Sequence, residues 1–173
     1  CEDRAGFLWA GTLGGGVNRN DGARLSVTTS REGLPSNGVM GLARDPDGSI
    51  WAGTWGGVSR YQNHDLNGGP CLPVEALAGA DAKSILRTRR GCTWVGTASS
   101  VLRDDGGTVV DICAAAGVPA VWVWVLLEDR AGRVWFGTWH DGLWCVSGDR
   151  LTSFSTRDGL AAVAAGADDF RHL

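Results

Sequence analysis

The histidines carry the most versatile chemistry in this 173-residue sequence, and none of them has the neighbours that metal binding or catalysis needs. His64, His140 and His172 have no second ligand close in sequence except adjacent carboxylates such as Asp65 and Asp141. Metal sites in proteins need several such ligands at regular spacing. No Ser or Cys can be matched with a positioned His as nucleophile and base. The sequence therefore predicts no metal site, no catalytic centre and no cofactor.

Aromatic side chains beside charged and amide groups offer another chemistry, the binding of a polar ring-shaped ligand. The apolar face of a sugar ring stacks on an indole, and its hydroxyls form hydrogen bonds at the side. The candidate ligand-binding residues are Trp55, Trp139, His140, Asp141, Arg31, Glu32, Asn37, Arg157 and Asp158. The alternative is that Trp55 and Trp139 only cover the ends of strands and that the charged side chains are solvated.

The five cysteines have no spacing that indicates a disulfide framework. Cys71 and Cys113 stand 23 and 22 residues before Trp94 and Trp135, so both fall near the same strand of neighbouring repeats. Packed sheets lie about 10 Å apart, whereas a disulfide needs Cα atoms within about 7 Å. We therefore expect Cys1, Cys71, Cys92, Cys113 and Cys145 to form no disulfide framework.

A four-residue motif recurs along the chain and indicates which elements must position these candidates. WAGT occurs at 9–12 and 51–54, WVGT at 94–97 and WFGT at 135–138, so the tryptophans are separated by 42, 43 and 41 residues. This period is typical of a propeller blade or of a helical-pair repeat. The residues of the motif are Trp9, Gly11, Thr12, Trp51, Gly53, Thr54, Trp94, Gly96, Thr97, Trp135, Gly137 and Thr138.

The composition favours the all-β alternative. The chain has 27 Gly among 173 residues, about twice the average usage, which stacked helices would not tolerate. The formal charge of −3 and the scattered Lys and Arg argue against nucleic acid or an anionic membrane surface as a partner. The most apolar run, 118–127, is too short to span a bilayer. Because the chain starts at Cys1 and shows no signal peptide, we expect it to be part of a longer protein.

Each period divides into four short strands, here named A to D in order, with the motif Trp in strand B. We expect the Trp to fill the gap between neighbouring sheets, the Gly to leave room for the adjacent sheet, and the Thr hydroxyl to reach a loop backbone. In an up-and-down blade, the A–B and C–D turns lie at one end of the strands, and the B–C turns and D–A connectors at the other. The candidate binding residues all fall on the second end, the loop face.

The repeats resemble the two-component regulator propeller family. The stretch NGVMGLARDPDGSIWAGTWGGVSRY, residues 37–61, nearly spells out the pattern of that family, and the connectors TTSREGLPSN and STRDGL look like its linkers. The third period departs most, because TASS replaces the Gly-Gly turn and RTRRG replaces the acidic turn. The resemblance implies a β-propeller of four-stranded antiparallel blades, with about four repeats of about 42 residues.

The resemblance also implies a function, the sensing of a ligand in the extracytoplasmic or periplasmic region of a bacterial hybrid histidine kinase or a related signalling protein. The ligand would be a polar small molecule such as an oligosaccharide. This segment would not be an enzyme, although a kinase domain and a membrane segment could lie elsewhere in the parent protein. A protein-interaction propeller without a small-molecule ligand is the main alternative, and a propeller lyase or hydrolase is a third.

The repeats divide the chain approximately into 1–36, 37–78, 79–119 and 120–160, a single propeller segment in which 161–173 starts a further strand A. This division gives three complete blades and strands B to D of the first. We expect an open arc of a larger propeller, because 161–170 is poor in β-branched and aromatic residues and would pair weakly. The alternative is a closed ring of four blades, in which 166–170 would pair with 7–12. Exposed edges at both ends would favour contact with further blades or self-association.

Overall fold

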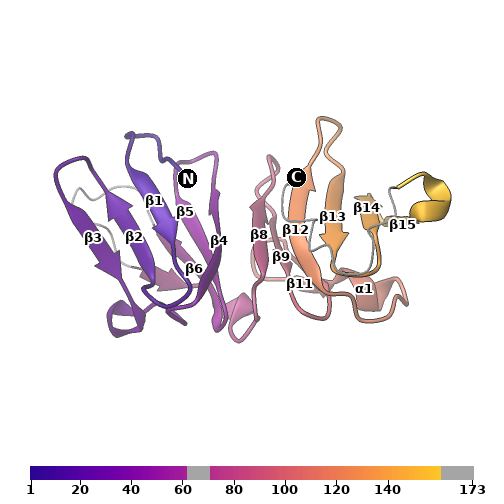
Figure 1. Cartoon of the computed structure of the whole chain (residues 1–173), viewed down its shortest axis with the longest axis horizontal. Coiled ribbons are helices and arrows are strands. Elements are labelled where there is room, and N and C mark those ends of the chain that lie inside the picture. Colours follow the sequence, from indigo (N-terminus) through magenta and orange to yellow (C-terminus); the bar gives the residue numbers. More distant parts are fainter. Residues whose placement is uncertain (62–70, 161–173) are drawn as a thin grey trace.

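The computed structural model describes residues 1–61 and 71–160, which form four antiparallel sheets in an open arc (Figure 1). The first sheet has three strands and the other three have four, and in every sheet the strands pair in chain order. This up-and-down order confirms the all-β prediction and the propeller blades. No helix in the described ranges is long and apolar enough to cross a membrane.

The strands follow the predicted division of each period. The first sheet contains β1 (Leu8–Gly11), β2 (Val17–Asn20) and β3 (Leu25–Thr28). The second contains β4 (Val39–Arg44), β5 (Ile50–Thr54), β6 (Gly57–Tyr61) and β7 (Cys71–Pro73). The third contains β8 (Ser84–Arg87), β9 (Thr93–Gly96), β10 (Val101–Asp104) and β11 (Val109–Asp111). The fourth contains β12 (Val123–Glu128), β13 (Val134–Thr138), β14 (Leu143–Ser147) and β15 (Arg150–Phe154).

Short helices occupy the connectors between the blades. They are η1 (Ser30–Glu32), η2 (Glu75–Leu77), α1 (Ile112–Ala115) and η3 (Thr156–Asp158). The first strands of the complete blades lie beside one another, β4 next to β8 and β8 next to β12. Among the described residues, strand A of the first blade is represented only by an isolated bridge between Glu2 and Leu8. The predicted strand in 161–173, and its pairing with 7–12 that would close the ring, lie outside the described residues.

The motif Trp of each sheet packs on the face toward the next sheet along the chain, which we call the forward face. Trp9 packs against Val39 and Tyr61 of the second sheet, with the Trp9 and Tyr61 ring centroids 5.2 Å apart. Trp51 and Trp94 lie in the same way between the second and third and between the third and fourth sheets. These three tryptophans are 5 to 7% exposed. The apolar core therefore lies between the sheets.

The fourth motif Trp departs from the prediction that all four are buried between sheets. Trp135 is only half-buried, and its ring stacks on Phe154 of its own sheet with the centroids 5.5 Å apart. The reason is its position, since no further sheet covers the forward face of the fourth sheet within the described residues.

The Gly and the Thr of the motif have the predicted roles. A Cβ added at Gly11 or Gly96 would lie about 3.0 Å from the Cβ of Val39 or Val123 in the next sheet, so the glycine permits the close approach. The Thr hydroxyls donate to backbone oxygens of the B–C turns, as Thr54 Oγ1 does to Gly57 O at 2.8 Å. Thr97 donates to Ser100 O at 3.1 Å, so the third blade keeps this contact although its turn sequence differs.

Candidate functional site

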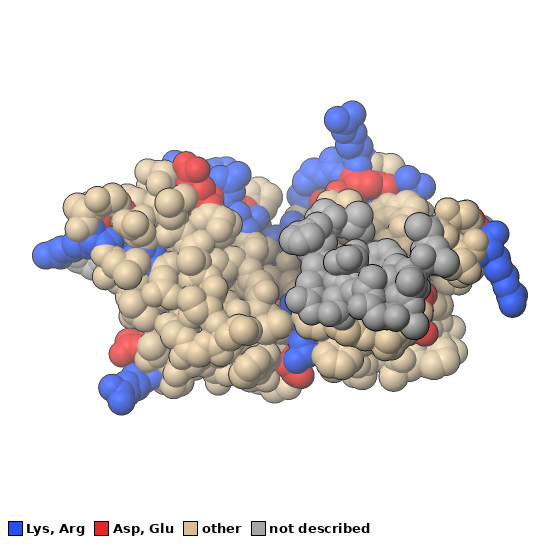
Figure 2. Space-filling view, viewed as in Figure 1, with Lys and Arg blue, Asp and Glu red and all other residues tan. Residues whose placement is uncertain are grey.

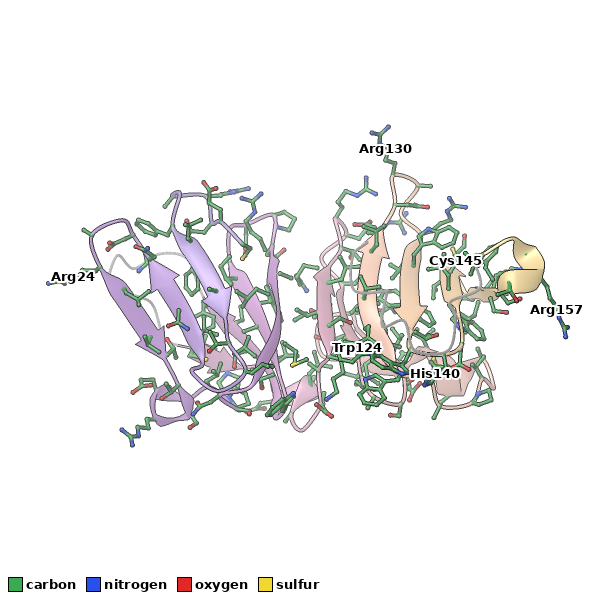
Figure 3. All side chains as sticks on the ribbon, in the orientation of Figure 1. Arg24, Trp124, Arg130, His140, Cys145 and Arg157 are labelled. Atoms are coloured by element: carbon green, nitrogen blue, oxygen red, sulfur yellow. The ribbon has the colours of Figure 1, made fainter. Side chains whose placement is uncertain are left out.

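The two ends of the strands differ in the side chains that they present. The A–B turn of the fourth sheet carries Arg130 at one end, whereas Trp124 and His140 lie toward the other end, among the B–C turns and D–A connectors (Figure 3). The strand directions expected from the sequence therefore hold. The candidate site is on the second end, the loop face.

Three tryptophans of the fourth blade form one aromatic group on the loop face. The rings of Trp122 and Trp124 stack with their centroids 5.7 Å apart and an interplanar angle of 12°. Trp139 lies 6.0 Å from Trp122 and 5.4 Å from Trp124. His140 extends the group, because its ring meets Trp139 edge-on at 5.9 Å.

Lys83 joins this group to Trp55 of the second blade. Its Nζ lies 5.9 Å from the Trp55 ring centroid and 6.0 Å from that of Trp122, within the range of a cation–π interaction. The same ammonium forms an ion pair with Asp81 at 2.9 Å, and the Lys83 side chain is only 13% exposed. We call Trp55, Lys83, Trp122, Trp124 and Trp139 the aromatic cluster.

Backbone contacts within each blade hold Trp139 and Trp55 in place. The N–H of Trp139 donates to Trp122 O at 2.9 Å, and the N–H of Trp55 donates to Gly38 O at 3.1 Å. The Trp55 indole also lies directly on Gly38, where an added Cβ would come within 2.5 Å of the ring. Because these bonds link a B–C turn with the preceding D–A connector, each tryptophan is fixed by its own blade.

The aromatic cluster presents apolar ring surface beside a fixed charge pair. Trp55 is 48% exposed and Trp122 is 42% exposed, while Asp81 and Lys83 supply acceptors and donors next to them. This combination suits a ligand with a flat apolar face and polar substituents at its edge. Groups of three or more His, Cys, Asp or Glu side chains that could hold a metal do not occur in 1–61 and 71–160.

The structure divides the nine predicted site residues into two sets. Trp55, Trp139 and His140 come together through Lys83 and Trp122, and Asp141 adjoins them with its carbonyl accepting from Trp144 Nε1 at 3.0 Å. The other five belong to the connector between β3 and β4 and to the segment that follows β15. They are Arg31, Glu32, Asn37, Arg157 and Asp158.

Most of the second set has a local structural role. Glu32 and Asp158 close capping boxes on η1 and η3 with Thr29 and Ser155. Hydrogen bonds from the Thr29 hydroxyl and backbone N–H hold the pKa of Glu32 below its ordinary value. Asn37 Oδ1 accepts from the Ser30 N–H at 2.7 Å.

Sequence reasoning missed four members of the site, Asp81, Lys83, Trp122 and Trp124. The run VPAVWVWVLL, residues 118–127, was considered above as too short to span a bilayer. Its alternation was a usable signal, because it places both tryptophans on one side and the valines Val121 and Val123 on the other, up to a β-bulge between Val123 and Val125. Lys83 gave no such signal, since only the packing of blades brings it beside rings from two other repeats.

Comparison with known proteins supports the propeller assignment. Residues 33–56 and 117–140 match the sequence model of the family described as Two component regulator propeller. No curated protein matches the chain in sequence.

Three solved structures illustrate the similarity in fold. The extracellular domain of BT4673, a one component system from B. thetaiotaomicron, is 25% identical with a TM-score of 0.67, covering 87% of this chain and 21% of that chain. That of the hybrid two component system BT3049 from the same organism is 22% identical with a TM-score of 0.73, covering 92% and 23%. Virginiamycin B lyase from Staphylococcus aureus is 14% identical with a TM-score of 0.68, covering 89% and 53%. The chain thus spans about a fifth of the two extracellular domains.

Proposed function

We propose that this chain, in which residues 33–56 and 117–140 match the two component regulator propeller family, is part of the ligand-sensing propeller of a bacterial two component signalling protein. The structures of extracellular domains that share its fold support an extracytoplasmic location. This chain would then bind the ligand, and a signalling domain elsewhere in the parent protein would transmit the signal.

The ligand in this proposal is a polar ring-shaped molecule such as an oligosaccharide, and the observation that carries it is the aromatic cluster. Trp55 and Trp122 expose indole surface on either side of Lys83, whose ammonium is paired with Asp81. A sugar ring would stack on an indole while its hydroxyls bond to Asp81, Lys83 or His140. The predicted residues Trp139 and Asp141 border the same surface.

The test is a screen of oligosaccharides by thermal unfolding, followed by substitution of the aromatic cluster. A ligand present at about 100 times its dissociation constant should stabilise the folded chain by about 2.7 kcal/mol. Trp122→Ala should abolish this shift and leave the fold intact, because the side chain is 42% exposed. The matched control is Arg130→Ala in the opposite turn, which should keep the shift. If only Arg130→Ala abolished the shift, the ligand would bind at the turn end of the strands, and the assignment of the site to the loop face would be wrong.

Two other functions would show themselves in the same experiment. A protein-interaction propeller would give no shift with any oligosaccharide, and its partner would compete for the exposed tryptophans. A propeller enzyme, as virginiamycin B lyase is, would convert the ligand, which mass spectrometry of the incubated mixture would detect. We propose a non-catalytic module, so the bound oligosaccharide should be recovered unchanged.

A further inference from the structure

A hydrogen bond recurs at the turn end of three of the four sheets. The motif indoles of Trp9 and Trp135 donate from Nε1 to Asp3 and Asp129, six residues earlier in each case, at 2.8 and 3.0 Å. Trp51 donates in the same way to Asp45 at 3.2 Å. One carboxylate oxygen takes the indole N–H. In the first and fourth sheets the other oxygen accepts backbone N–H groups of the turn.

The third sheet lacks this carboxylate. Thr88 stands at the equivalent position, and its Oγ1 accepts the backbone N–H of Cys92 at 3.1 Å. The hydroxyl thereby replaces one carboxylate oxygen, but there is no second oxygen for the indole of Trp94. Trp94 is 5% exposed, and its Nε1 has no hydrogen bond within the part of the chain that the structure describes. The indole N–H of Trp94 is therefore available as a donor.

A second difference between the blades concerns the residue at the turn end of strand A, beside the motif Trp of the preceding sheet. Between the second and third sheets, Arg87 at the end of β8 fills the space, with Nη2 2.8 Å from Asp45 and Cζ 4.3 Å from the Trp51 ring centroid. The equivalent residue at the end of β12 is Glu128. Its carboxylate accepts the Arg89 N–H at 2.8 Å and pairs with Arg89 Nε at 3.3 Å, so it does not fill the space in that way.

The result is a cavity of about 430 Å³ between the third and fourth sheets, lined by Thr88, Cys92 and Trp94 on one side and by Glu128, Val134 and Val146 on the other. It lies at the turn end of the strands, where charged side chains gather (Figure 2), opposite the aromatic cluster. Its volume is in the range of small-molecule sites. The wall formed by Trp94 and the two valines is apolar and suits the body of an organic molecule.

The charges around the cavity favour an anion. Arg103 lies over the Trp94 ring, with Cζ 5.9 Å from the centroid, and pairs with Asp105 at 3.0 Å. Arg90 also lines the cavity and has no ion pair with any described residue. The charged residues of the lining are Arg90, Arg103, Asp105 and Glu128, and Arg90 is the one of these four without an ion pair among the described residues.

We propose that this cavity binds a small carboxylic acid with an apolar body, and that its carboxylate accepts the hydrogen bond of Trp94 Nε1. The ligand carboxylate takes the place that Asp3, Asp45 and Asp129 hold in the other sheets. The repeat itself thus identifies the chemical group, because a carboxylate meets the motif indole in each of the three other blades.

The test measures binding of phenylacetate to the whole chain by isothermal titration calorimetry, with phenylacetamide as the uncharged control of the same shape. The acid should bind at least about tenfold more tightly than the amide, because charge-assisted hydrogen bonds are the stronger ones. Equal affinity of the two compounds, or a phenylacetate dissociation constant above about 10 mM, would overturn the proposal.

Two substitutions locate the site. Thr88→Asp supplies the missing carboxylate from the chain itself, so it should raise the melting temperature and weaken phenylacetate binding at least about tenfold. Thr88→Ser keeps the hydroxyl and should bind as the original chain does. Trp94→Phe keeps the ring but removes the N–H and should lose binding, whereas Trp51→Phe, whose N–H already meets Asp45, should retain it. Unchanged binding in Thr88→Asp would refute the proposal even if Trp94→Phe failed to fold.

Discussion

The bond between the motif indole and an aspartate fixes both ends of the A–B turn. Asp129 shows the arrangement most fully, since it accepts from Trp135 Nε1 at 3.0 Å and from the Arg133 backbone N–H at 3.0 Å. The hydrogen bond from Trp135, followed by those from Arg133 and the charge of Arg133, lowers the pKa of Asp129 well below its ordinary value. The carboxylate thus stabilises the turn in its charged form.

We expect this stabilisation to depend on pH. Because the pKa of Asp129 is lower in the folded than in the unfolded chain, its contribution is present above the unfolded pKa of about 3.9 and is lost as pH falls through the folded value. Asp129→Asn should therefore unfold more easily than the original chain at neutral pH, and the difference should shrink toward strongly acidic pH. Urea unfolding at several pH values measures it. A difference that is constant with pH would contradict the assignment.

The single tyrosine provides a second titration with the opposite sign. Tyr61 is 3% exposed and lies between the first two sheets, where burial raises its pKa far above 10. The folded chain therefore holds the phenol proton more tightly than the unfolded chain, and the stability that follows is lost as pH rises above about 10. Ultraviolet difference absorbance should show no tyrosinate until the chain unfolds. Reversible ionisation near pH 10 with native circular dichroism would contradict this expectation.

At the scale of the strand, the motif works through one face only. Trp9, Trp51 and Trp94 each fill the space in front of their own sheet, while the glycine two residues later allows the next sheet to approach. A blade is therefore completed by the blade that follows it. The contribution of a motif Trp to the free energy of unfolding therefore depends on whether the next blade is present.

Substitution of two equivalent tryptophans should show this dependence. Trp51→Ala should reduce the free energy of unfolding by about 3 to 5 kcal/mol, the usual effect of emptying a large buried aromatic site. Trp135→Ala should have a smaller effect, because Trp135 is half-buried and its forward face meets no further sheet in the described ranges. Guanidinium unfolding of both variants provides the measurement. Equal losses would mean that the two sites are packed alike.

At the scale of the whole molecule, the arc leaves apolar sheet faces at its two ends that no other sheet of the described residues covers. On the first sheet Leu8, Leu25 and Val27 share one face and are 57%, 66% and 47% exposed, whereas Ile50, the counterpart of Leu8, is fully buried. On the fourth sheet Leu127 is 51% exposed beside Trp135. Positions that are buried between blades elsewhere are thus open to solvent here.

We expect these faces to make the isolated chain associate as its concentration rises. Sedimentation velocity should show larger species at higher concentration, and Leu8→Lys should suppress them because the charge would have to be desolvated in the contact. Leu13→Lys is the control, since Leu13 is equally exposed, at 65%, but lies in a B–C turn outside the sheets. A chain that stays monomeric throughout, or a control that disrupts association equally, would argue against contact through the sheet faces.

The sequence by itself determined the architecture and the order of the strands, because each rests on local rules. Period, alternation and turn residues recur in every repeat, and they also placed Trp55, Trp139 and His140 on the loop face. Local rules could also have found Trp122 and Trp124 in the alternating run before β13. Glu32 and Asp158 close the capping boxes of η1 and η3, which are also local features, and their part in a binding site stays a prediction.

Only the tertiary structure decided which residues meet across blades. Lys83 lies between Trp55 and Trp122, and Trp94 lines a cavity whose opposite wall includes Glu128. Each of these depends on the distance between sheets, which is set by the side chains packed between them. Repeated motifs make the blades alike, so a site arises where one blade differs from the others and its neighbour does not compensate. That difference can be read in the sequence, but the space it leaves is fixed only by packing.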